Sequence, residues 1–184
     1  AQTGPGGVGL ADGTSSLQGW WRAETGVTSS AGVVSAWADQ SGYGHGFTQP
    51  TAGNRPTVTT NATLNGRTVI RYTSASSQFF TAPTYTGPNS ADLTLFFVAN
   101  GTNYQSLIRF QNSGGTFVVF PWNLGSPANS FITSSDGGTG GGIASGLVSS
   151  ANNIAGARYR ANTTNGMQTW LNGGINAQRT STGA

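Results

Sequence analysis

Any chemistry in this chain would have to come from very few titratable side chains. The 184 residues include eight arginines, one histidine and five carboxylates, with no lysine or cysteine. The carboxylates are Asp12, Glu24, Asp39, Asp92 and Asp136. A glycosidase needs two carboxyl groups about 5 to 9.5 Å apart across the scissile bond, and no two of these lie close in the sequence. We therefore predict that the chain is not an enzyme. The alternative that stays open is a hydrolase whose two carboxyl groups come from distant strands.

Metal and nucleophile chemistry is equally short of ligands. His45 is the single histidine, and the sequence has no Gly-x-Ser-x-Gly elbow to hold a nucleophilic serine. We therefore expect no Ser-His-Asp triad. One histidine and no cysteine are too few for zinc. We expect no cofactor, with calcium as the one exception. Calcium binds loop carboxylates and carbonyls, so Asp39 is the candidate calcium ligand. Alternatively, Asp39 caps the turn that follows it by accepting backbone N–H groups.

Aromatic side chains in polar loops are the better candidates for a binding site. Sugars dock on aromatic faces and hydrogen-bond to nearby polar groups. Trp122 follows a proline in a loop rich in Pro, Gly and Asn, Tyr104 directly follows Asn103, and Asp136 begins a glycine-rich stretch. We predict that these four residues bind a ligand. The alternative is that the large rings only cover the edge of the core.

Charge and hydropathy exclude two classes of partner. The net charge of +3 is spread over single arginines, with Arg158 and Arg160 the one alternating pair, whereas nucleic-acid binding needs a clustered basic face. No apolar run approaches the roughly 18 residues that cross a bilayer, so we expect no membrane insertion. From the charged fraction of 7% and the start at Ala1 without methionine we expect a processed, secreted or cell-surface protein, although a fragment of a longer chain would begin in the same way.

Short strands must position these side chains. Turn-forming residues interrupt the chain about every eight to twelve residues, a pattern typical of all-β domains. We expect a flexible glycine-rich lead-in over residues 1–16 and a single domain over residues 17–184. The run at 93–99 is apolar at nearly every position, which predicts a central strand covered on both faces. The predicted strands are 17–22, 33–39, 67–72, 77–81, 93–99, 105–110, 116–120, 129–133, 154–161, 166–171 and 175–179. Hairpin turns are predicted at Asn65-Gly66, at 112–115 and at 172–174, and the glycine-rich segment 134–146 is predicted to be a loop.

Several motifs follow one another along most of the chain. They read WWRAETGV at 20–27, VSAWADQSGYGH at 34–45, TQ at 48–49, NRP at 54–56, NG at 65–66, VIRY at 69–72 and WLNG at 170–173. In this order they resemble concanavalin A-like, laminin G-like (LamG) domains, which occur in large surface proteins and adhesins of gliding bacteria. The resemblance implies a two-sheet antiparallel jelly-roll sandwich of the lectin and glucanase superfamily.

The resemblance also implies a function. We expect a non-catalytic carbohydrate-binding or surface-binding (adhesion) module of an exported bacterial protein, with a glycan or cell-surface polymer as partner. Family members often leave the cell by the type IX secretion route, so the outer-membrane export machinery is a further expected partner. The family's acidic and aromatic closing strand has no counterpart before Ala184, so we expect the C-terminal strand to be missing. The alternatives are a structural or passenger domain without a ligand and a divergent polysaccharide hydrolase.

Overall fold

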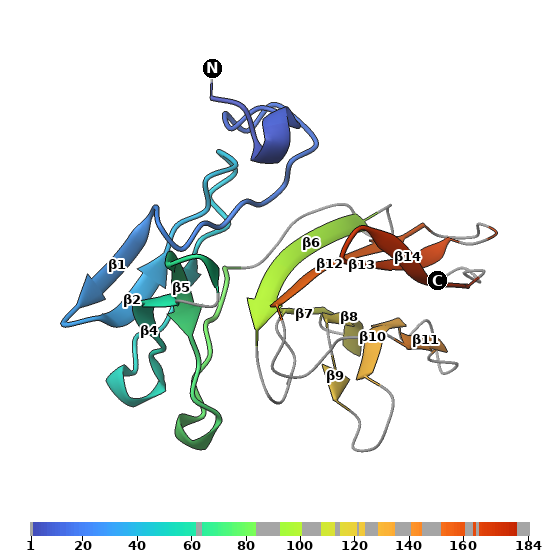
Figure 1. The fold of residues 1–184 in the computed structure, drawn as a ribbon. Helices are drawn as coiled ribbons and strands as arrows, with labels where there is room; N and C mark the ends of the chain where they lie inside the picture. Colours follow the sequence, from blue (N-terminus) through green and yellow to red (C-terminus); the bar gives the residue numbers. More distant parts are fainter. Residues whose placement is uncertain are drawn as a thin grey trace. The chain divides into compact units, whose positions relative to one another are not determined.

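The protein is built from antiparallel strands, as its computed structural model shows (Figure 1). The chain forms two compact units, Ala1–Gly87 and Pro88–Ala184. Among the described residues, no helix is long and apolar enough to cross a membrane. The structure describes residues 2–61, 64–83, 93–100, 108–112, 115–120, 122–123, 129–134, 141–144, 152–160, 164 and 166–179.

The first unit contains one five-stranded sheet. Its order is β1-β2-β4-β5, with β3 also pairing with β2. The turn between β4 and β5 places Asn65 and Gly66 at positive φ, which confirms the hairpin turn predicted from this pair. Short 3-10 turns lie at Pro5–Gly7, Ala52–Asn54 and Ser74–Ser76. The strands are β1 (Val27–Ser30), β2 (Val33–Trp37), β3 (Phe47–Thr48), β4 (Thr57–Asn61) and β5 (Arg67–Arg71).

Aromatic rings pack around β2 and β3 in this unit. The ring centroid of Phe47 lies 4.7 Å from that of Trp21 and 6.2 Å from that of Trp37. Val34 is fully buried, and both indoles donate hydrogen bonds to backbone carbonyls. The core of the unit therefore combines a small aliphatic centre with indoles whose polar N–H groups are satisfied.

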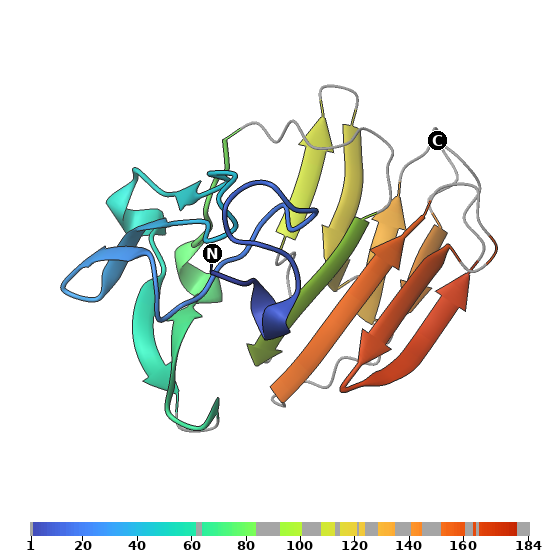
Figure 2. The ribbon, with the colours of Figure 1, turned by 90° about the horizontal axis from the view of Figure 1, so that it is seen from above.

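The second unit is a two-layer arrangement of antiparallel strands (Figures 1 and 2). One layer is a four-stranded sheet in the order β14-β13-β12-β6, and β11 of the other layer contacts β13 and β14. The strands of the four-stranded sheet are β6 (Leu93–Asn100), β12 (Asn152–Tyr159), β13 (Met167–Leu171) and β14 (Gly174–Arg179). The others are β7 (Ile108–Asn112), β8 (Gly115–Phe120), β9 (Trp122–Asn123), β10 (Asn129–Ser134) and β11 (Gly141–Ala144).

The all-β antiparallel sandwich predicted from the sequence is confirmed. Its jelly-roll connectivity, the single domain over 17–184 and the missing closing strand stay predictions. The hairpins β7–β8 and β13–β14 occur where the glycine pairs predicted them, and β13–β14 turns at Asn172 and Gly173 with positive φ. The sequence did not predict β1, β3, β4, β9 or β11, and β11 lies in the stretch expected to be a loop.

Three strand predictions were wrong. The segment at residues 77–81 forms no strand and contributes only an isolated bridge between Thr81 and Thr48. The segment at residues 17–22 forms only an isolated bridge between Arg22 and Thr25, because its backbone bonds to a turn: Trp20 N–H donates to Asp39 and Trp20 carbonyl accepts from Gln40 N–H. Within the described strands, β6 is the end strand of its sheet, not a central one. Its burial alternates, with Phe96 71% exposed, so only one face is covered there.

The buried centre of the first unit gives a stability prediction. Val34→Ala should lower the free energy of unfolding by about 2 kcal/mol, because two buried methyl groups lose their packing and leave a cavity. Urea denaturation followed by tryptophan fluorescence measures the change. Val8→Ala removes the same atoms from a side chain that is 71% exposed, and it should leave the unfolding midpoint unchanged. Equal losses for the two variants would contradict the assignment of Val34 to the core.

Candidate functional site

An exposed apolar face lies on the four-stranded sheet of the second unit. Along β12, odd-numbered residues such as Ala155 and Ala157 are buried, whereas Ile154 is 58% exposed. On the same face, Val98 of β6 pairs with Ile154, and Ile175 of β14 is also exposed. Exposed apolar side chains that lie together on one face mark interaction sites more often than scattered ones do.

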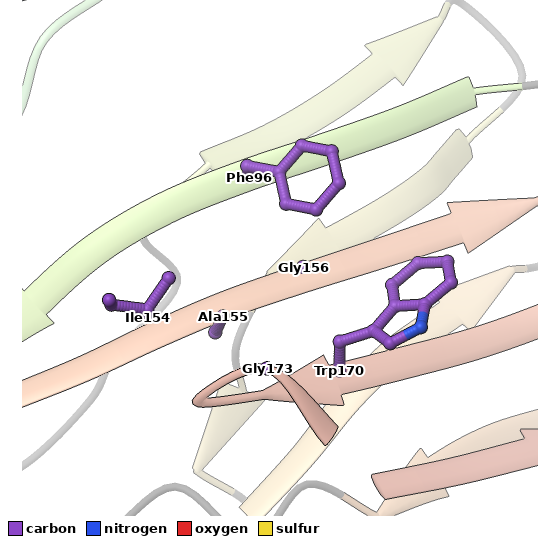
Figure 3. A pocket seen from close by; sticks show the side chains of 6 residues that line it. All are labelled: Phe96, Ile154, Ala155, Gly156, Trp170 and Gly173. Atoms are coloured by element: carbon purple, nitrogen blue, oxygen red, sulfur yellow. The ribbon is translucent and has the colours of Figure 1, made fainter. Parts of the chain in front are cut away.

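The centre of this face is a row of paired residues. Gly156 of β12 pairs with Phe96 on one side and with Trp170 on the other, and Trp170 pairs with Ile175. Figure 3 shows the two rings on either side of the glycine, with centroids 6.2 Å apart and planes inclined by 32°. They bound a shallow hollow of about 270 Å³. We call it the aromatic trough, lined by Phe96, Ile154, Ala155, Gly156, Trp170 and Gly173.

The trough depends on the absence of a side chain at Gly156. A Cβ atom there would lie 2.6 Å from Cε1 of Phe96 and 3.3 Å from Cε3 of Trp170. Any larger residue would therefore displace the phenyl ring. A glycine inside a strand often marks a place where another group approaches the backbone closely, and here the two aromatic rings make that approach.

A polar row lies beside the aromatic one. Arg158 pairs with Thr94 on β6 and Gln168 on β13. Gln168 pairs in turn with Gln178 on β14 and donates a hydrogen bond of 3.3 Å to its side-chain oxygen. The guanidinium carbon of Arg158 lies 5.9 Å from the centre of the Trp170 ring, which is a cation–π distance. We call Thr94, Arg158, Gln168 and Gln178 the polar strip.

Asp39, the candidate calcium ligand, holds a turn together in the first unit. Its Oδ1 accepts the backbone N–H groups of Trp20 and Ser41, both at 2.8 Å. Its Oδ2 accepts the Ser41 hydroxyl at 2.6 Å and the His45 backbone N–H at 3.0 Å. Four donors point at the carboxylate, and donor hydrogens repel a cation, so this arrangement does not fit calcium and matches the turn-capping alternative.

The same hydrogen bonds set the charge state of Asp39. Partial burial would raise the pKa of its carboxyl group, but hydrogen bonds from Ser41, Trp20 and His45 together outweigh that cost and lower the pKa. Other motif residues are used in the same structural way. The buried Gln49 donates to the Phe79 carbonyl at 2.8 Å.

The other described carboxylates also bind their own neighbours. Asp12 accepts the Thr14 hydroxyl at 2.6 Å, and this hydrogen bond is the main cause of its lowered pKa. Glu24 pairs with Arg22 at 2.8 Å, and the hydrogen bond from Arg22 lowers the pKa of the glutamate. All three described carboxylates lie in the first unit, and no described residue of the aromatic trough is acidic.

The residues predicted to bind a ligand are only partly described. Trp122 lies in β9, where its backbone pairs with Ser130, whereas Asn103, Tyr104 and Asp136 fall outside the described residues. Their role stays a prediction. Sequence reasoning missed Phe96 and Trp170 as site residues. The signal that could have found them is a glycine in the middle of a predicted strand, flanked on both neighbouring strands by aromatic residues.

Comparison with family models, curated proteins and solved structures gives no match for this chain. The resemblance to LamG domains therefore stays a hypothesis based on the motifs, and the structure contributes the all-β sandwich.

The Asp39 turn gives a prediction on acid stability. Asp39→Asn should lower the free energy of unfolding at neutral pH by about 2 kcal/mol, because an amide cannot accept four hydrogen bonds and lacks the charge. The lowered pKa means that wild-type stability from this group is present above the unfolded pKa of about 4 and is lost as the pH falls through the folded pKa. Unfolding measured between pH 2 and 7 should therefore show a flatter acid limb in the variant.

Asp12→Asn is the matched control, because that carboxylate lies in an exposed turn, and it should change stability less. Calcium should leave the melting temperature of the wild type unchanged. A calcium-dependent rise that Asp39→Asn abolishes would contradict the structural role and establish a metal site.

Proposed function

We propose that the protein binds carbohydrate without cleaving it, through the aromatic trough and the polar strip. The single observation that carries the proposal is the pairing of Phe96 and Trp170 across Gly156 on an exposed sheet face. Aromatic rings present apolar faces that fit the C–H faces of a sugar ring. The polar strip beside them offers hydrogen-bond donors and acceptors for hydroxyl groups, as binding sites with few polar groups commonly do.

The biological setting follows from the resemblance rather than from the fold. A module that binds a glycan or another cell-surface polymer fits a secreted or cell-surface protein of the adhesin type, exported by the type IX route. Because one fold can serve many functions, the binding proposal depends on the geometry of the trough and not on the fold. The engaged carboxylates of the first unit favour binding over hydrolysis, because a glycosidase needs a carboxyl group free to protonate the leaving oxygen.

One observation favours a second candidate, a passenger or structural domain. The apolar face extends beyond the trough to Val98 and Ile175, which are 62% and 63% exposed. Apolar surface of this kind is also typical of faces covered by a neighbouring protein surface. In that case Trp170 would stabilise an interface and bind no sugar.

The proposal predicts that Trp170→Ala lowers glycan affinity at least about tenfold, because truncated aromatic anchors commonly cost this much. A glycan array selects the ligand, and isothermal titration calorimetry measures the affinity. Trp170→Phe keeps a ring and should retain part of the affinity. Val8→Ala, at an exposed apolar position of the first unit, should leave the affinity unchanged.

Three outcomes would overturn or redirect the proposal. Failure to bind any glycan would favour the passenger domain. Binding that Trp170→Ala leaves intact would place the site elsewhere, with Trp122 and Tyr104 as the next candidates. Release of reducing sugars from a polysaccharide, abolished in Glu24→Gln, would favour the hydrolase.

A further inference from the structure

The polar strip borders a positively charged part of the chain. The second unit, residues 88–184, contains two acidic residues, Asp92 and Asp136, which both lie outside the described residues, and the arginines Arg109, Arg158, Arg160 and Arg179. Arg158 lies in the strip itself, and Arg160 follows the end of β12 with an exposed side chain. Positive charge beside a sugar-sized hollow favours ligands of the opposite sign.

Arg158 has a donor that the described residues do not satisfy. Its Nε is the only buried side-chain nitrogen or oxygen in the described part of the chain without a hydrogen-bond partner. The one ion pair among the described residues joins Arg22 to Glu24, so none of the described carboxylates neutralises Arg158. A buried donor without an acceptor is costly. Because Nε itself is enclosed, an oxyanion would bind at the terminal nitrogens of the guanidinium group and supply a negative charge beside it.

Arg158 lies beside Trp170. Its guanidinium carbon is 5.9 Å from the ring centre, a distance at which the ring attracts the cation. A guanidinium edge matches carboxylate and sulfate oxygens with two parallel N–H···O bonds. Trp170 also lines the trough, so one indole could contact both the sugar ring and the arginine that binds its acidic group.

We propose that the aromatic trough selects acidic glycans, with Arg158 binding the carboxylate or sulfate of a sugar stacked on Trp170. This inference rests on the proposed carbohydrate binding and narrows its ligand class to sugars that bear an oxyanion. Arg158 is the specificity-determining residue, and Trp170 supplies the stacking surface common to acidic and neutral sugars.

The test compares polymers that differ only in charge. Affinity electrophoresis would use polygalacturonate against its methyl ester for carboxylates, and dextran sulfate against dextran for sulfates. The wild type should bind at least one acidic polymer about tenfold more tightly than its neutral counterpart, and Arg158→Gln should abolish the difference. Arg158→Lys keeps the positive charge but lacks the planar guanidinium group, so this variant should retain only part of the preference for acidic polymers.

Arg71→Gln is the matched control, because it removes one exposed positive charge from β5 in the first unit. It should leave the preference for acidic polymers unchanged, and a loss equal to that of Arg158→Gln would show nonspecific attraction to net charge and overturn the inference. Circular dichroism and the melting temperature verify that each variant is folded.

The two proposals fail in different ways. If acidic and neutral polymers bind equally and Trp170→Ala weakens both, carbohydrate binding stands and the acidic selectivity is overturned. If none of the polymers and no glycan on the array binds, the carbohydrate-binding function is itself overturned.

Discussion

The register of β12 against its two neighbours is the constraint on which the second unit depends. Side chains alternate between the faces of a strand, so this register turns Ala155 and Ala157 inward and Gly156 and Arg158 outward. A slip by one residue would bury the arginine and expose the alanines. The inward alanines are buried, and the outward glycine leaves the space that the neighbouring rings fill.

Hydrogen bonds to backbone groups play the comparable part in the first unit. Asp39 joins Trp20, Ser41 and His45, which lie in separate parts of two loops. Arg55 donates to the carbonyl of Gln49 at 2.7 Å and to that of Pro50 at 2.8 Å. The residues that stand out most clearly in the motifs are therefore those that hold irregular backbone in place. The hydrogen-bonding groups of these side chains stabilise the fold of the first unit, and the candidate site lies in the second unit.

This division explains how much the sequence could predict. Glycine turns and β-branched runs indicated most strands, and the Asn65-Gly66 and Asn172-Gly173 turns located two hairpins. The segment at 17–22 misled because its apolar pattern suits a strand, whereas its backbone bonds to a distant carboxylate that local patterns do not reveal. The trough was missed for a similar reason. Its rings come from strands far apart in sequence, and only sheet pairing brings them together over Gly156.

The aromatic trough also shows how a structural need can produce a binding surface. A glycine in a strand interior weakens the sheet because it has no side chain to pack, and rings from both neighbouring strands compensate by covering it. Both rings approach the backbone at Gly156 closely, and any restriction of their motion by this contact would reduce the conformational entropy lost on binding. Phe96 is 71% exposed although it covers the glycine, which leaves an apolar face for a sugar ring. The guanidinium group of Arg158 beside the trough would add a charged hydrogen bond to sugars that bear an oxyanion, whereas neutral sugars would bind by stacking alone.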